Sequence, residues 1–411
     1  MQNTVTALES KIDAVRERLN ALKSGIIEGC KNTVKHKLYF EKEALPPGGE
    51  KPSLPARAGN LTCVAEPFDK LPDGDEVTLY RIAGGKRITV EILSFGGIIH
   101  RLLTPDKAGN IADVVLGQDS IAIYQHQSLG ACAGAVIGRV ANRISKACFE
   151  IGDNIYKLDA NFGGDVIHGS TGIYATKNFT GKPYSNEDSA GVVLSLTDTG
   201  EGGFPGKVDV TVTYSLDNYG NFRIHYTALL EMDTPINLTN HVYFNLVGHG
   251  TGEVGGHVMQ LNADFITPND ARGMTTGEIR NVKGTDFDYT LPKPLQTGFD
   301  SEDPLFTQFG GFDMNFCIRG RGMRRGGSIM DPISGRVMEF FTDQPGVQVY
   351  TMPNLADNVY GKGGVHYVKL GAVCLETQMY PDCVNISHFP NPFVSAGTKY
   401  ETDTIYRFSV I

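Results

Sequence analysis

Several features that define common protein classes are missing from this chain. No stretch is long and apolar enough to span a bilayer, and no basic segment followed by an apolar run opens the sequence as a signal peptide would. The spacings C-x-x-C and H-E-x-x-H are absent, so no metal site is predicted. Basic residues are not in excess, because Lys+Arg number 37 against 46 Asp+Glu and the net charge is −9. Nucleic acid and membranes are therefore not expected as partners.

The seven cysteines show no pattern of pairs, which argues against a disulfide framework. Four of them lie in apolar runs and are predicted to be small core residues: Cys132, Cys148, Cys317 and Cys374. This usage favours a reducing, cytoplasmic location. One basic run, Arg319–Arg325, interrupts the acidic balance. We interpret it as a solvated loop, with an anion contact as the alternative.

Length and composition predict an all-β fold. The chain has 411 residues, of which 41% are hydrophobic, enough for a substantial core. Its 49 glycines and 20 prolines favour many turns and short strands. Strand candidates recur between Asn/Asp/Gly turns: Arg87–Leu93, Asp113–Leu116, Gly191–Leu196, Lys207–Leu216, Phe222–Leu230, Val337–Thr342, Val347–Tyr350 and Ile405–Val410.

A single carboxylate interrupts an apolar run near the C-terminus. Residues 371–375 (G-A-V-C-L) predict a buried strand, and Glu376 stands at its end, shortly before the turn signal Y-P-D at 380–382. Burying a lone carboxylate is costly unless the group is paired or hydrogen-bonded, and the usual response is a raised pKa. Glu376 is therefore either a satisfied structural acid or a tuned general base.

A histidine stands among β-type residues in the segment 240–246 (N-H-V-Y-F-N-L). His241 suits proton transfer near neutral pH, although a core histidine satisfied by a backbone carbonyl is the competing interpretation. Further segments combine polar side chains with glycine or aromatic residues: 138–144 (G-R-V-A-N-R-I), 166–170 (V-I-H-G-S) and 311–316 (G-F-D-M-N-F).

Together these segments resemble the aldose 1-epimerases, also called galactose mutarotases. The resemblance runs from about Val77 to Ile411 and rests on motifs that occur in the family's order and approximate spacing. They are S-F-G-G at 94–97, D-V-V-L-G at 113–117, residues 134–144, I-H-G at 167–169, E-G-G-F-P-G at 201–206, residues 238–246 and 311–316, Q-P-G-V-Q at 344–348, and residues 375–382. It implies a large antiparallel β-sandwich.

The resemblance also implies a role for each matched position. Glu376, in L-E-T-Q, matches the family's general base, and His241, in N-H-x-Y-F-N, matches its general acid. The positions that match sugar contacts are Asn142, Arg143, His168, Tyr243, Asp313 and Gln348. Some positions depart from the family: Ser170 replaces a common glycine, Tyr380 replaces a common tryptophan, and the chain has no tryptophan at all. These departures concern the wall that packs against the sugar more than the acid–base pair.

The implied reaction interconverts the α and β anomers of an aldohexose such as galactose or glucose. A proton leaves the C1 hydroxyl, another reaches the ring oxygen, the ring opens, the C1 group rotates, and the ring closes again. Because the two transfers occur at different atoms, two groups in opposite protonation states are needed. No redox or phosphoryl-transfer step occurs, so no cofactor is implied. The alternatives are a non-catalytic sugar-binding module and a hexose-6-phosphate 1-epimerase, which would need a basic cluster.

The N-terminal region lies outside the resemblance. Two sets of apolar residues have a spacing of seven within each set, and the sets are offset from each other as the a and d positions of a coiled coil are. They are Leu8, Val15 and Leu22, and Ile12, Leu19 and Ile26. We therefore divide the chain into an amphipathic helix at 1–29, a linker and irregular extension at 30–76, and a catalytic β-sandwich at 77–411. Three roles stay open for the helix: packing on the sandwich, self-association, and tethering or targeting.

Overall fold

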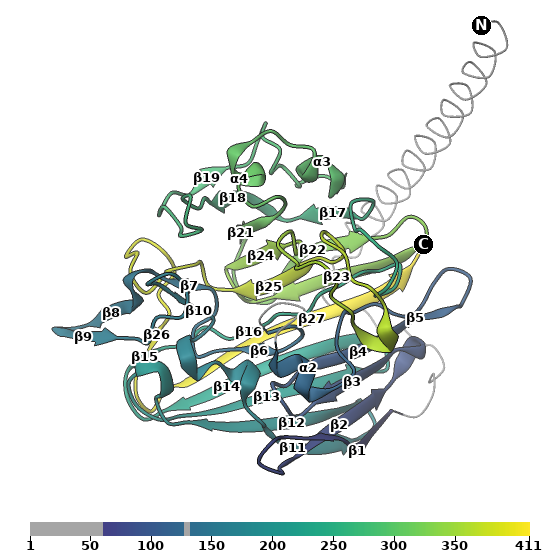
Figure 1. Ribbon diagram of the computed structural model, residues 1–411, viewed down its shortest axis with the longest axis horizontal. Helices are drawn as coiled ribbons and strands as arrows, with labels where there is room; N and C mark the ends of the chain where they lie inside the picture. The colour runs from purple at the N-terminus through teal and green to yellow at the C-terminus, as the bar shows by residue number, and fades with distance from the viewer. Residues whose placement is uncertain (1–60, 127–131) are drawn as a thin grey trace, which may run out of the picture. The chain divides into compact units, whose positions relative to one another are not determined.

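The computed structural model describes residues 61–126 and 132–411, in which three large sheets dominate (Figure 1). The helix expected at 1–29 lies outside the described residues, and so do residues 30–60 of the linker and extension expected at 30–76. Helices in the described part are short: α2 (Ile121–Gln125), α3 (Gln296–Phe299) and α4 (Pro304–Thr307). None of these described helices has the length and hydropathy that crossing a membrane requires. The all-β class is therefore confirmed.

The largest sheet has nine strands, and its central strands show why the sequence folds this way. In β13 every second side chain of V-D-V-T-V-T-Y-S-L-D is buried, which is the period of two expected for a strand with one face on the core. All neighbours pair antiparallel. The order is β11 (Thr180–Ser185), β12 (Ser189–Asp198), β13 (Val208–Asp217), β14 (Asn221–Leu230), β27 (Lys399–Val410), β23 (Arg336–Thr342), β22 (Arg324–Met330), β17 (Val258–Leu261) and β20 (Lys293–Pro294).

Two five-stranded antiparallel sheets accompany it. The first has the order β1 (Thr62–Lys70), β2 (Glu76–Ala83), β3 (Thr89–Leu93), β4 (Ile99–Pro105) and β5 (Ile111–Asp113). The second, which we call the site sheet, has the order β19 (Arg280–Asn281), β18 (Ala263–Thr267), β21 (Asp313–Ile318), β24 (Gly346–Tyr350) and β25 (Cys374–Gln378). One continuous cluster of buried side chains, including Val90, Val212 and Phe316, joins all three sheets into a β-sandwich.

Short ribbons and turns complete the described fold. The two-stranded ribbons are β7 (Arg143–Ile144) with β10 (Val166–Ile167), β6 (Val136–Ile137) with β16 (Thr239–Asn240), β8 (Cys148–Ile151) with β9 (Asn154–Lys157), and β15 (Thr234–Pro235) with β26 (Phe393–Val394). The 3-10 turns are η1 (Gly85–Arg87), η2 (Ser145–Ala147), η3 (Ser170–Gly172), η4 (Tyr174–Thr176), η5 (Glu201–Gly203) and η6 (Lys362–Gly364). In Figure 1, β7, β10 and β16 are drawn beside the β25 edge of the site sheet.

The strand expected at 87–93 begins at Thr89, since Arg87 belongs to the turn η1, and three further segments differ from the sequence patterns. Residues 62–70, expected to be irregular, form β1; this outer strand is mostly exposed, so no hydrophobic alternation marks it. The strand expected at 113–116 is wrong beyond Asp113, because the N–H of Leu116 leaves the sheet and donates to the carbonyl of Tyr243 at 2.9 Å. The strand near the C-terminus begins at Cys374 rather than at 371, because Gly371 closes a turn onto the carbonyl of Val368.

Candidate active site

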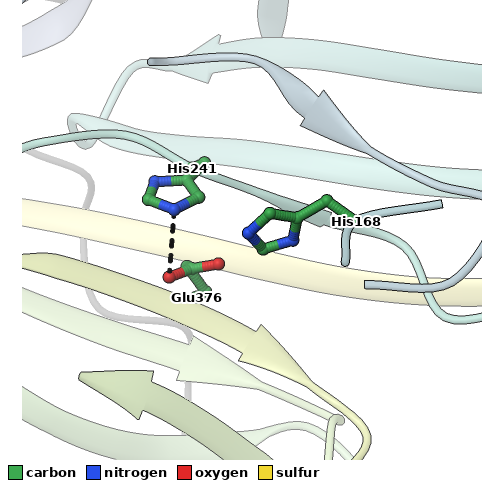
Figure 2. A group of neighbouring side chains, drawn as sticks. All are labelled: His168, His241 and Glu376. Atoms are coloured by element: carbon green, nitrogen blue, oxygen red, sulfur yellow. Dashed lines mark ion pairs between the residues drawn. The ribbon is translucent and has the colours of Figure 1, made fainter. Parts of the chain in front are cut away.

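Glu376 and His241 face each other in the interior of the protein (Figure 2). Glu376 lies at the centre of β25 and is only 2% exposed, whereas His241 directly follows the short strand β16. Oε1 of Glu376 is 3.6 Å from Nε2 of His241. The other carboxyl oxygen, Oε2, is buried and has no hydrogen-bond partner among the described residues. One oxygen of the acid is thus directed at the imidazole, and the other can accept a proton from a ligand.

Burial shifts the pKa values of both groups. It raises the pKa of Glu376 well above its usual 4.5, and the nearby Asp313 charge adds to this rise while Arg143 opposes it. Burial also lowers the pKa of His241 to about 4, against the opposing effects of its own backbone and Asp313. The protein surroundings alone therefore favour a protonated carboxyl beside a neutral imidazole. Moving one proton from Glu376 to His241 leaves the net charge of the pair unchanged, so either arrangement holds the same number of protons.

His168 lies beside this pair on the loop that follows β10. Its ring centroid is 5.3 Å from that of His241, and the two rings are nearly perpendicular. The N–H of Asn142 donates to Nδ1 of His168 at 3.3 Å, and burial lowers the pKa of this histidine well below 6.5. The neutral ring therefore carries its proton on Nε2 and can donate it to a hydroxyl. The next residue must be glycine, because a Cβ on Gly169 would stand 2.0 Å from the carbonyl oxygen of Gly138.

A carboxylate clamp joins Arg143, Asp313 and Gln348. Nη2 of Arg143 donates to Oδ2 of Asp313 at 3.0 Å, and Nε2 of Gln348 donates to Oδ1 at 2.6 Å. The clamp connects β7 with β21 and β24 of the site sheet. Within the described residues, Nε of Arg143 and Oε1 of Gln348 are buried without a hydrogen-bond partner. One donor and one acceptor therefore remain for a polar ligand.

Aromatic rings fix the orientation of the His241 imidazole. The ring of Tyr243 stacks on it with a centroid distance of 4.9 Å and an interplanar angle of 24°. Tyr350 meets the same imidazole edge-on at 6.0 Å. The eight residues singled out in the sequence thus lie in one continuous set of neighbours, and Gln348 closes it because it pairs directly with Glu376 across β24 and β25.

Two neighbours of His241 were not singled out for the site from the sequence: Tyr350, and Cys374, whose Sγ lies 3.6 Å from Nδ1 of His241. The strand period supplies a signal for both. Cys374 stands two residues before Glu376 on β25, and Tyr350 stands two residues after Gln348 on β24, so each shares a face of its strand with a residue already singled out.

The site also contains a set of atoms that could bind a cation. One ligand atom each from His168, His241 and Glu376 lies within 4.8 Å of the others. Two neutral imidazoles and a carboxylate are a donor set that suits zinc. Two of these residues, His241 and Glu376, also face each other at 3.6 Å, so a cation bound there would contact both.

Three of the four arginines in the basic run Arg319–Arg325 are paired with acceptors of the protein, and the fourth, Arg321, is exposed. Arg319 pairs with Asp264, and Arg325 pairs with Glu339 at 2.7 Å. Arg324 donates to backbone carbonyls, among them that of Gln344 at 2.7 Å. These three guanidinium groups are therefore held by acceptors of the protein itself.

Comparisons with known proteins agree with this fold. Residues 78–407 match the family model described as aldose 1-epimerase. A galactose mutarotase from Bos taurus is 40% identical over 326 residues, which cover 79% of this chain and 92% of that protein. An aldose 1-epimerase from Haemophilus influenzae is 32% identical over 340 residues, 82% of this chain and 97% of that protein. The solved structure of an aldose epimerase homologue from C. elegans has a TM-score of 0.74 at 28% identity, covering 81% and 99%. The chain belongs to the aldose 1-epimerase family.

Proposed function

We propose that Glu376 and His241 are the acid–base pair with which this aldose 1-epimerase interconverts the α and β anomers of an aldohexose. The observation that supports it most directly is the buried Oε2 of Glu376, which lacks a partner among the described residues while Oε1 faces Nε2 of His241. Galactose is the aldohexose we propose first, because several relatives, including those from Bos taurus and Homo sapiens, are named galactose mutarotases.

In the proposed reaction, Oε2 of Glu376 accepts the proton of the C1 hydroxyl. The O–H electron pair forms the C1 carbonyl, the bond between C1 and the ring oxygen breaks, and Nε2 of His241 delivers a proton to that oxygen. Rotation about C1–C2 presents the other face, and the same transfers in reverse close the ring. Each proton transfer typically contributes roughly 10²–10⁴ in rate.

The remaining matched residues are proposed to hold the sugar. Arg143 offers its unpartnered Nε, Gln348 offers Oε1, and His168 offers Nε2–H. Asp313 already accepts from both Arg143 and Gln348, so we assign it the role of fixing these two side chains as well as accepting from a hydroxyl. Asn142 orients His168, and Tyr243 supports the ring of His241.

A paired base and acid distinguish this proposal from its alternatives. A module that only binds sugar has no need of a buried carboxylate directed at a buried imidazole. A hexose-6-phosphate epimerase would need a cluster of free basic groups, and in the basic run only Arg321 is not held by acceptors of the protein among its four described arginines. The cytoplasm is the compartment we propose, and the cysteines of the described residues are free thiols, as a reducing environment would keep them.

Polarimetry on freshly dissolved α-D-galactose tests the proposed function, with α-D-glucose and glucose 6-phosphate in parallel. We expect the enzyme to accelerate the change in rotation of the two free sugars well beyond the spontaneous rate. If the enzyme accelerates the change in rotation of glucose 6-phosphate alone, the substrate would be a hexose 6-phosphate instead of a free aldohexose. No acceleration with any of the three, combined with measurable sugar binding, would support the non-catalytic module.

A further inference from the structure

An aromatic ring and a glycine backbone contact the guanidinium of Arg143. Its Cζ atom lies 5.4 Å from the centroid of the Phe162 ring, within the distance at which a cation and an aromatic face attract each other. A Cβ on Gly273 would reach the same Cζ atom at 3.4 Å, so this backbone passes close to the guanidinium. We propose that Phe162 is a positioning residue that holds Arg143 in the orientation from which its Nε binds the sugar. This inference rests on the proposed function, because it deepens the role that Arg143 has there.

Phe162 belongs to a tight turn at residues 161–165, which lies between β9 and β10 in the chain. The N–H of Phe162 donates to the carbonyl of Asp165 at 3.1 Å, and the N–H of Asp165 donates back to the carbonyl of Phe162 at 2.8 Å. The side chain of Asn161 accepts the N–H of Ile167 at 2.8 Å and donates to the carbonyl of the same residue at 2.9 Å. The aromatic ring is therefore carried by a backbone that hydrogen bonds fix on both sides.

The glycine comes from a second turn, at residues 270–274, and an ion pair joins the two turns. Gly273 has a φ of +82°, a left-handed conformation that glycine adopts without strain. Nη1 of Arg272 lies 3.6 Å from Oδ2 of Asp165. Oδ1 of Asp165 accepts the backbone N–H of Lys146, in the turn η2 directly after β7, at 2.7 Å. Both turns are therefore tied to the segment that carries the arginine of the site.

The hydrogen bonds of Arg143 do not by themselves fix the direction of Nε. Nη2 donates to Oδ2 of Asp313 at 3.0 Å, whereas Nε is buried and has no hydrogen-bond partner among the described residues. The guanidinium group is planar and stacks on aromatic faces, so the Phe162 ring restricts its rotation about the bond to Asp313. An aromatic face is uncharged and takes up no N–H of its own in the way a carbonyl does. The ring can therefore orient the guanidinium while Nε stays available for a sugar hydroxyl.

The exposure of the two side chains indicates a role in binding more than in folding. Phe162 is 38% exposed, whereas Arg143 is only 9% exposed. Loss of the ring therefore removes little buried apolar surface, and the fold should tolerate it. The same loss uncovers one side of the guanidinium, which can then turn away from the sugar. Sugar binding is thus the property that a substitution of Phe162 should change first.

Steady-state kinetics on galactose with the full-length protein test the inference. We expect Phe162→Ala to raise KM about fivefold with kcat nearly unchanged, the size of one exposed cation–π contact. Phe162→Tyr keeps the aromatic face and should restore the wild-type KM, whereas Phe162→Leu keeps only apolar volume and should not. The matched control is Phe341→Ala, which removes a ring 4.6 Å from Cζ of Arg407 on β23 and β27 and should leave KM unchanged. A wild-type KM in both Phe162→Ala and Phe162→Leu overturns the inference.

A double-mutant cycle separates an action through Arg143 from a direct contact of the ring with the sugar. Arg143→Met removes the guanidinium and keeps an apolar stem. In this background Phe162→Ala should change kcat/KM no further, because no guanidinium remains to be oriented. If Phe162→Ala lowers kcat/KM by the same factor in both backgrounds, the ring acts on the sugar or on the fold, and the inference fails.

The outcomes also separate this inference from the proposed function. If Arg143→Met keeps the wild-type kcat/KM, the sugar contact proposed for Arg143 fails, and the inference fails with it. If Arg143→Met is impaired but Phe162→Ala is not, only the role of Phe162 fails. The activity of Glu376→Gln reports on the acid–base pair alone, so a fully active Glu376→Gln would overturn the proposed function whatever the KM of the Phe162 variants.

Discussion

Gln348 and Glu376 are directly paired across the adjacent strands β24 and β25. Directly opposed residues of an antiparallel pair project to the same face of the sheet, so the amide and the carboxylate stand side by side. Gln348 in turn donates to Asp313, which binds Arg143. The proposed base therefore lies on the same sheet as two members of the proposed sugar clamp, Gln348 and Asp313, and a shift of either strand would disturb both.

The first prediction concerns the base. Glu376→Gln keeps the shape of the side chain but cannot accept the C1 proton, so mutarotation should slow by roughly 10²-fold or more. Polarimetry on galactose measures the rate, and circular dichroism checks the fold. His241→Asn should cause a comparable loss. A folded Glu376→Gln enzyme with nearly the wild-type rate would rule out the base assignment.

A second prediction concerns the clamp. Asp313→Asn removes the charge that fixes Arg143 and Gln348, so KM for galactose should rise about tenfold or more while the unfolding free energy falls by about 1–3 kcal/mol. Steady-state kinetics and urea denaturation measure the two effects. The control is Asp264→Asn, which breaks the exposed pair with Arg319 and should cost less than about 1 kcal/mol. Equal effects of the two substitutions would contradict a special role for the clamp.

The buried histidines predict a dependence of stability on pH. Burial lowers the pKa of His241 to about 4 and that of His100 further still. Between these values and about 6.5 the unfolded chain binds protons that the folded chain does not, so the unfolding free energy should fall as pH is lowered through this window. Glu376, whose pKa is raised, contributes with the opposite sign.

Urea denaturation at several pH values between about 4 and 7 measures this slope. His100→Gln removes one group that takes up a proton on unfolding. The slope of its unfolding free energy against pH should therefore correspond to the uptake of up to one proton fewer than in the wild type. His388→Gln is the control, because His388 lies on an exposed segment of the described chain. A wild-type slope in His100→Gln would show that His100 is not held neutral.

A further prediction concerns metal ions as inhibitors. Zn²⁺ should inhibit competitively with galactose, because His168, His241 and Glu376 supply a zinc-type donor set from the atoms proposed for catalysis. A chelator should restore the activity, and Mg²⁺, which prefers oxygen ligands, should have little effect. His168→Gln should weaken the inhibition by Zn²⁺. The same substitution should have a smaller effect on the binding of an unrelated ion. Inhibition that galactose does not relieve would place the zinc elsewhere.

The last prediction concerns the N-terminal region, which contains none of the proposed site residues. Deletion of residues 1–60 should leave mutarotation per folded molecule nearly unchanged. Light scattering on full-length and truncated protein tests the predicted a/d stripe. An assembly that dissociates on truncation supports self-association through the helix, whereas a monomer in both forms excludes it. A large loss of activity would show that the segment is not dispensable.

The all-β class could be predicted because central strands such as β13 alternate between a buried and a partly buried face. The outer strand β1 could not, since an edge strand exposed on most positions leaves no such pattern. The residues proposed for the site came from matched motifs, but their contacts were not predictable. That Cys374 meets Nδ1 of His241 depends on how β25 packs against the loop after β16, which no local pattern encodes.

The position of one buried arginine could not be predicted from the sequence either. Arg139 lies in the motif that also contains Asn142 and Arg143, and its residue type would equally suit sugar binding. The structure instead buries it completely, where it pairs with Asp198 and donates to the carbonyls of Pro205 and Gly206. It therefore holds the E-G-G-F-P-G segment in place.

The distribution of the site over the chain has a consequence for folding. Arg143 and Asn142 come from the first half of the sequence, while Glu376 enters with β25, the last strand of the site sheet in chain order. Contacts between residues so distant in sequence form late, because closing long loops is slow. Recovery of mutarotation during refolding should therefore lag behind the recovery of β-structure, and catalysis would report the final docking step of the molecule.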